Sequence, residues 1–157
     1  MHLHRQLAID AAPADVWRCI TEYELRKRWM GQLVSEELDD PERRGAGTTA
    51  TVRLRQNGKV VEYRSTVIDW EPERKLSVGI TGGTLPPDLA MGAIYELSPA
   101  DDVSKTVLNY DFHLPVKSFF MRLLSPLIRK GAAKAVDPDL ARLKALAESL
   151  ASESGGN

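Results

Sequence analysis

The segment at residues 117–152 constrains the fold of this chain most, because it carries the 3.6-residue period of an amphipathic helix. A helix of about thirty residues would be about 45–50 Å long, and most of its stability would come from a partner surface. The pattern therefore predicts one long helix with one broad apolar face. Its apolar residues, spaced mostly three and four apart, are Phe119, Phe120, Leu123, Leu124, Leu127, Ile128, Ala132, Ala135, Val136, Leu140, Leu143, Leu146, Ala147 and Leu150.

Two prolines and a glycine interrupt this segment. Pro126 and Pro138 each remove a backbone N–H and crowd the preceding turn, so we expect kinks or breaks near Ser125 and Asp137. Gly131 lies midway, where glycine costs about 1 kcal/mol relative to alanine. Two explanations stay open for it: close packing of the helix on a sheet, or a hollow between helix and sheet.

Two short helices are expected near the start of the chain, after a first strand at residues 3–9. Pro13 suits the first position of a helix. A second helix is expected to run from Thr21 or Glu22 to Trp29, with Thr21 as its N-cap and Glu24 as the capping-box partner.

From residue 33 onward the period of the apolar residues changes to two, which predicts strands. The expected strands lie at 33–38, 48–55, 59–70, 75–80, 90–97 and 106–114. Asn57-Gly58 predicts a type I′ hairpin turn, since both central residues of that turn need positive φ.

This order of elements predicts an α+β fold. We expect a curved antiparallel sheet of six to seven strands wrapped around the long helix, with two short helices after the first strand. Residues 1–152 would form a single domain, and residues 153–157 a disordered tail. A hollow between sheet and helix would be the natural binding site.

Composition excludes several function classes. A formal net charge of −1 argues against a broad nucleic-acid footprint. No window approaches 18 apolar residues, so we expect no stable membrane insertion. The single cysteine, Cys19, allows no intramolecular disulfide, and the first residues lack the apolar core of a secretory signal. The expected location is the cytoplasm, and the oligomeric state is unknown.

Several stretches resemble a known family. Residues 9–17 (IDAAPADVW), Ile20-Thr21, Trp29, residues 71–76 (EPERKL) and residues 95–99 (YELSP) are similar to the START-like helix-grip (SRPBCC, Bet v 1-like) superfamily, in its polyketide cyclase/dehydrase-like branch. The resemblance implies a helix-grip fold with an apolar cavity. Its members include lipid and hormone carriers as well as cyclases, so the resemblance implies no single reaction.

The sequence offers few residues for catalysis or metal binding. His2 and His4 lack a third ligand nearby, so we predict no metal, and no catalytic residue or cofactor is assigned. Asp111 and His113 alternate with apolar residues and are expected on the solvated face of their strand. A bulge that reversed the register would instead bring them into the cavity as an acid–base pair.

We predict a binding protein, acting as a carrier or sequestering a hydrophobic small molecule such as a lipid, sterol or polyketide. One alternative is a cyclase or dehydratase that uses a tyrosine, Asp111 or His113 in the cavity, and another is a protein-interaction module. Access is expected through the loop at 82–88 and the start of the long helix, and no Lys or Arg is expected to point inward. The candidate ligand-binding residues are Trp29, Val52, Leu54, Tyr63, Val78, Met91, Tyr95, Tyr110, Phe112, Phe120, Leu124, Ile128 and Gly131.

Overall fold

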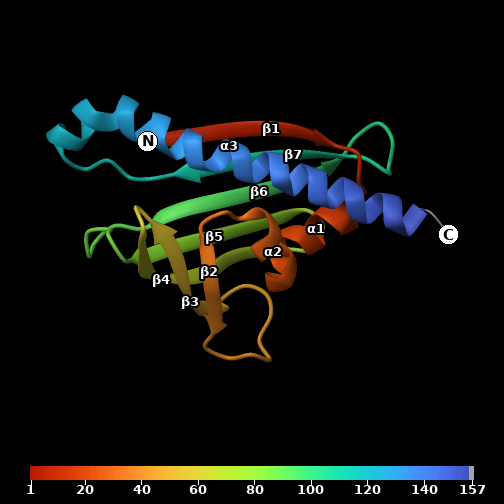
Figure 1. Cartoon of the computed structure of the whole chain (residues 1–157), viewed down its shortest axis with the longest axis horizontal. Helices are drawn as coiled ribbons and strands as arrows, with labels where there is room; N and C mark the ends of the chain where they lie inside the picture. Colours follow the sequence, from red (N-terminus) through yellow and green to blue (C-terminus); the bar gives the residue numbers. More distant parts are fainter. Residues whose placement is uncertain (156–157) are drawn as a thin grey trace.

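A computed structural model describes residues 1–155 and confirms the predicted order of elements. One strand is followed by two short helices, six further strands and one long helix (Figure 1). The strands are β1 (His2–Ile9), β2 (Leu33–Leu38), β3 (Thr49–Gln56), β4 (Lys59–Glu71), β5 (Lys75–Gly82), β6 (Met91–Pro99) and β7 (Thr106–His113). The helices are α1 (Pro13–Thr21), α2 (Tyr23–Trp29) and α3 (Phe119–Gly155).

The seven strands form one antiparallel sheet in the order β1-β7-β6-β5-β4-β3-β2. The predicted hairpin between β3 and β4 is confirmed, since Asn57 has a φ of 51° and Gly58 a φ of 76°. The register shifts between Val67 and Asp69 of β4, and such a bulge bends a sheet. Figure 1 shows the result: β2, β3 and β4 are turned steeply away from the direction of β1 and β7.

The second short helix does not begin as predicted. Its N-cap is Glu22, not Thr21, and no side chain caps it. The hydroxyl of Thr21 instead donates a hydrogen bond of 2.7 Å to the carbonyl oxygen of Trp17, one turn back in α1. Thr21 therefore closes the first helix, and its side chain is no longer available to start the second.

The long helix α3 has 37 residues and continues through Pro126 and Pro138. Neither proline breaks it, although Figure 1 shows the first turns lying at an angle to the long straight part. At about 1.5 Å per residue the helix is about 55 Å long. It ends later than the sequence predicts, because residues 153–155 of the expected tail are helical, while 156–157 lie outside the described residues.

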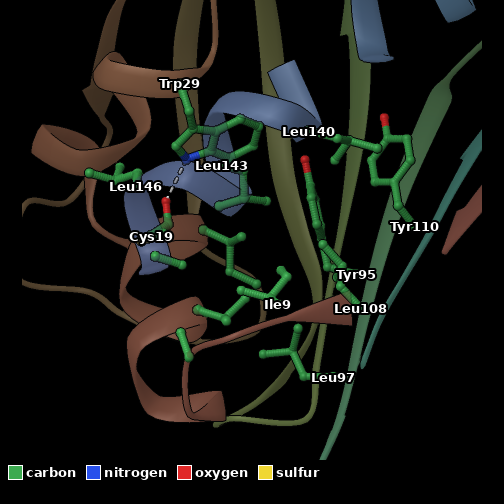
Figure 2. Close-up of a cluster of buried hydrophobic side chains, with 14 of the residues drawn as sticks. Ile9, Cys19, Trp29, Tyr95, Leu97, Leu108, Tyr110, Leu140, Leu143 and Leu146 are labelled. Atoms are coloured by element: carbon green, nitrogen blue, oxygen red, sulfur yellow. Dashed lines mark hydrogen bonds between the residues drawn. The ribbon is translucent and has the colours of Figure 1, made fainter. Parts of the chain in front are cut away.

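The main core lies where the second half of α3 meets α1, α2 and the sheet (Figure 2). Trp29 is buried there, and its indole N–H donates a hydrogen bond of 2.8 Å to the carbonyl oxygen of Cys19. The fully buried or nearly buried members from α3 are Leu140, Leu143, Leu146 and Ala147.

The expectation of one broad apolar face along all of α3 is wrong. Leu143 is fully buried, whereas Leu123 is 65% exposed. These residues are 20 positions apart, which at about 100° per residue places them about 160° apart around the helix axis. The apolar residues of the first turns therefore point away from the core that the second half of the helix covers. No helix in the described part of the chain is long and apolar enough to cross a membrane.

Candidate ligand-binding cavity

A cavity of about 1000 Å³ lies between the inner face of the sheet, helix α2 and the middle of α3. Alternate residues of a strand share one face, so strands β3 to β7 send alternate side chains into this space. The strand residues on the wall include Ala50, Val52 and Leu54 of β3, Ser65 and Val67 of β4, Val78 and Ile80 of β5, Met91, Ala93 and Tyr95 of β6, and Tyr110 and Phe112 of β7.

Small residues of α3 form the opposite wall. Gly131, Ala132 and Ala135 all line the cavity, followed by Val136 and Asp139. A Cβ atom added at Gly131 would have no neighbour within 4 Å. Of the two explanations for this glycine, the structure supports the hollow, because close packing would leave no open space beside it.

Eight of the thirteen predicted ligand-binding residues lie on the cavity wall. They are Val52, Leu54, Val78, Met91, Tyr95, Tyr110, Phe112 and Gly131. A ligand role for them remains a prediction, since their position does not test it.

The other five predicted residues do not line the cavity. Trp29 belongs to the main core, Phe120 and Leu124 are exposed on the first turns of α3, and Ile128 is half-buried. Tyr63 belongs to a second core cluster, where its hydroxyl donates a hydrogen bond of 2.7 Å to Gln56. Its ring lies so close to the backbone of Gly83 that a Cβ there would be 2.3 Å from it. Tyr63 is thus a packed structural residue.

The expectation that no Lys or Arg faces the cavity is also wrong, because Arg26 and Arg44 lie on its wall. Arg26 forms an ion pair of 2.5 Å with Glu36, and their side chains are only 19% and 11% exposed. The Nε atom of Arg26 is buried with no hydrogen-bond partner among residues 1–155. The sequence could have indicated that Arg26 faces inward. Leu25 and Trp29 are one turn apart on the buried side of α2, and Arg26 lies next to that side.

Tyr95 and Tyr110 place two phenols at the boundary of the core and the cavity. Their ring centroids are 5.1 Å apart, and Figure 2 shows both hydroxyls pointing the same way, away from Leu97. Burial raises the pKa of both phenols, and for Tyr95 the positive charge of Arg26 opposes that rise. Both therefore keep their protons at neutral pH and can donate hydrogen bonds to a ligand oxygen.

Asp111 and His113 lie outside the cavity, as the alternation of β7 predicts. Asp111 pairs at 2.8 Å with His4, its neighbour on β1, and the side chains of His4 and Asp111 are 57% and 40% exposed. The ring of His113 lies against that of His2, with centroids 4.2 Å apart, and partial burial lowers its pKa. Across residues 1–155 no cluster of three or more His, Cys, Asp or Glu side chains has metal-binding geometry.

Neither part of the predicted entrance, residues 82–88 and the start of α3, contributes to the wall. Leu85 of this loop packs on the second core cluster, and Asp88 pairs with Lys117 at 3.0 Å. The wall is instead completed by the junction of α1 and α2 and by Arg44 and Gly45, which precede β3.

Comparisons with known proteins agree with this geometry. Residues 1–148 match the model of a family described as polyketide cyclase / dehydrase and lipid transport. No curated protein matches the sequence.

Several solved structures have the same fold. A START superfamily protein from Mycobacterium smegmatis has a TM-score of 0.74 at 12% identity, over 95% of this chain and 98% of that one. The ZhuI aromatase/cyclase from Streptomyces sp. R1128 has a TM-score of 0.70 at 15% identity, over 94% and 93%. A Thalictrum norcoclaurine synthase mutant with a bound transition-state analogue has a TM-score of 0.68 at 21% identity, over 94% and 93%. The helix-grip fold and the START-like resemblance are thereby confirmed.

Proposed function

Because the chain belongs to the polyketide cyclase / dehydrase and lipid transport family, we propose that it binds an apolar small molecule in the cavity between its sheet and α3. The observation that supports this best is the hollow itself, about 1000 Å³ with a largely apolar wall. A space of this size falls at the upper end of the range for small-molecule sites. Burial of apolar ligand surface contributes about 25 cal/mol per Å², so a few hundred Å² gives useful affinity without a charged partner.

Two neighbouring hydroxyls on the wall can hold a polar end of the ligand. Tyr95 and Tyr110 offer protonated hydroxyls, whereas Arg26 is already paired with Glu36. A neutral oxygen, as in the hydroxyl of a sterol or the carbonyl of a polyketide, fits these two donors. Beside the two phenols, a phosphate or carboxylate would have to compete with Glu36 for Arg26, so we expect neutral oxygens to bind more tightly there. Arg44, the other cation on the wall, donates to the backbone carbonyl oxygens of Pro41 and Arg43.

A second candidate is a cyclase- or dehydratase-type enzyme. The observation that favours it is the pair of buried phenols beside Asp139, a carboxyl group that also lies on the cavity wall. A phenol with a raised pKa stays protonated at neutral pH, so it does not act as a base, but it can donate a hydrogen bond to an oxygen on which negative charge develops. An interaction module is less well supported, because a filled core would serve that role better than a hollow one. The cytoplasmic location stays a prediction from the sequence.

Ligand binding can be tested with the purified protein directly. Native mass spectrometry of freshly purified protein would reveal a co-purified ligand, and an apolar environment-sensitive dye would report an open cavity. Displacement by sterols, acyl lipids and aromatic polyketides would then rank the ligand classes. Failure to find either a bound mass or dye uptake would refute the binding proposal.

Two matched variants test whether a hydroxyl on the cavity wall contributes to ligand affinity. Tyr95→Phe removes a hydroxyl on the cavity wall, while Tyr63→Phe removes one outside it. We expect Tyr95→Phe to weaken the binding of an oxygen-bearing ligand by about two- to thirteenfold, the range for a net hydrogen bond of about 0.5–1.5 kcal/mol. Tyr63→Phe should leave ligand affinity unchanged. Turnover of an aromatic polyketide substrate, lost in Tyr95→Phe, would favour the enzyme instead.

A further inference from the structure

The first turns of α3 carry an apolar surface that nothing in the described structure covers. Its residues sit at positions i, i+1, i+4, i+5 and i+8, so they share one side of the helix. We call this set the apolar face of α3: Phe119, Phe120, Leu123, Leu124 and Leu127, exposed by 76%, 69%, 65%, 37% and 69%. None of them lines the cavity or packs on either core cluster. Contiguous exposed apolar residues of this size mark an interaction site.

The charge around this face has one sign. Residues 114–136 contain five Lys or Arg and no Asp or Glu. The whole chain has a formal net charge of −1, so the remaining residues carry −6, since −1 minus +5 is −6. The segment that carries the exposed apolar side chains is therefore net positive, whereas the rest of the chain is net negative.

Four of these five cations are available to a partner. The ion pairs at this end of the described structure are Lys117 with Asp88 and Arg5 with Asp137. Neither involves the other four cations of the segment, which are Arg122, Arg129, Lys130 and Lys134.

By helical spacing, the four cations lie at one edge of the apolar face and beyond its C-terminal end. Lys130 and Lys134 continue the row of Phe119, Leu123 and Leu127 along the same side of the helix, at steps of three and four residues. Arg129 and Lys130 line a groove of about 420 Å³ between α3 and β1. Apolar side chains bordered by cations in this way have the composition of a helix that lies in a membrane interface.

We propose that the apolar face of α3 docks the protein on an anionic lipid bilayer. The Phe and Leu side chains enter the boundary between headgroups and acyl chains, while the four cations meet lipid phosphates. A second copy of this chain fits less well, because a two-fold symmetric contact would place each cationic segment against its copy. The docked helix would lie close to the cavity, since Gly131 follows Leu127 by about one turn.

Vesicle flotation tests this proposal without any bound ligand, so its outcome is independent of the cavity. We expect wild-type protein to float with vesicles of phosphatidylglycerol and phosphatidylcholine and to stay unbound with phosphatidylcholine alone. Raising the salt concentration should release it, because the surface potential acts only within a Debye length.

Two variants separate the apolar and electrostatic parts. Leu123→Asp/Leu127→Asp should abolish flotation, while the control Val103→Asp/Ile68→Asp, which alters exposed apolar residues elsewhere, should not. Arg122→Gln/Lys130→Gln/Lys134→Gln should lower the partition coefficient about a hundredfold, at about fivefold per cation. All changed positions are exposed, so melting temperatures should stay at the wild-type value.

Three results would overturn the proposal. The first is wild-type protein that does not float with anionic vesicles at low salt. The second is a Leu123→Asp/Leu127→Asp variant that floats as well as wild type. The third is a dimer, detected by light scattering, that this double variant dissociates, which would assign the face to a second copy of the chain.

Discussion

Replacing Gly131 with leucine tests whether the middle of α3 borders open space. A Cβ at this position meets no atom within 4 Å, so the new side chain can extend into the cavity without displacing a neighbour. Glycine is about 0.8–1.0 kcal/mol less favourable than alanine in a helix, and leucine is close to alanine. We therefore expect Gly131→Leu to stabilise the fold by about 0.5–1 kcal/mol. For a domain of this size, that raises the melting temperature by about 1–4 °C.

The same substitution should weaken ligand binding. If the leucine displaces about 50 Å² of ligand surface from the wall, the loss at about 25 cal/mol per Å² is about 1.3 kcal/mol, or about tenfold in affinity. Thermal unfolding measures the first effect, and dye displacement measures the second. A substitution that raises stability and weakens ligand binding indicates a cavity, whereas a substitution at an exposed surface position would leave ligand binding unchanged.

Two other residues of α3 serve as controls for Gly131→Leu. Ala147 is fully buried in the main core, so Ala147→Leu should destabilise the fold by about 1–3 kcal/mol through overpacking. Ala141 is exposed and does not line the cavity, so Ala141→Leu should change neither stability nor binding by much. A fall in melting temperature for Gly131→Leu as large as that for Ala147→Leu would refute the argument.

Three further predictions follow from individual contacts. Leu143→Ala should lower the free energy of unfolding, measured in urea, by about 2–5 kcal/mol, because Leu143 is fully buried. Leu123→Ala, on the exposed face of α3, should change it by less than about 0.5 kcal/mol. Equal losses would contradict the assignment of the core. Hydrogen bonds from Arg64 and Thr49 lower the pKa of Asp39 to about 2, so the ion pair stabilises the fold above about pH 4, and this stabilisation is lost as the pH falls toward 2. Asp39→Asn should therefore reduce the dependence of the melting temperature on pH between about pH 4 and pH 2. An unchanged dependence would argue against the ion pair. Glu36→Gln leaves Arg26 unpaired on the cavity wall, so it should lower the stability of the fold. In dye displacement, it should shift the preference of the cavity from neutral ligands toward fatty acids. An unchanged preference would show that Arg26 does not reach the ligand.

The sequence by itself determined the elements and their order. The alternation of apolar residues from residue 33 onward predicts the strands, and Asn57-Gly58 predicts the turn between β3 and β4, because these signals depend only on neighbouring residues. The same alternation placed Tyr110 and Phe112 on one face of β7 and Asp111 and His113 on the other, which is how the structure has them. The glycine at 131 also marked the hollow, although the sequence alone allowed close packing equally well.

Tertiary structure decided which apolar residues face the cavity, the core or solvent. Tyr63 and Tyr95 both lie on strands with the same pattern, but the close approach of Gly83 packs Tyr63 into a core cluster while Tyr95 borders the hollow. Phe120 and Leu143 both belong to a helical apolar pattern, yet only the part of α3 that meets α1 and α2 is covered. Arg26 lies on the wall because the short helix α2 is positioned beside β2, where Glu36 balances its charge. In each case the deciding contact joins residues on different helices, strands or loops, and the periodicity within one element carries no information about such contacts.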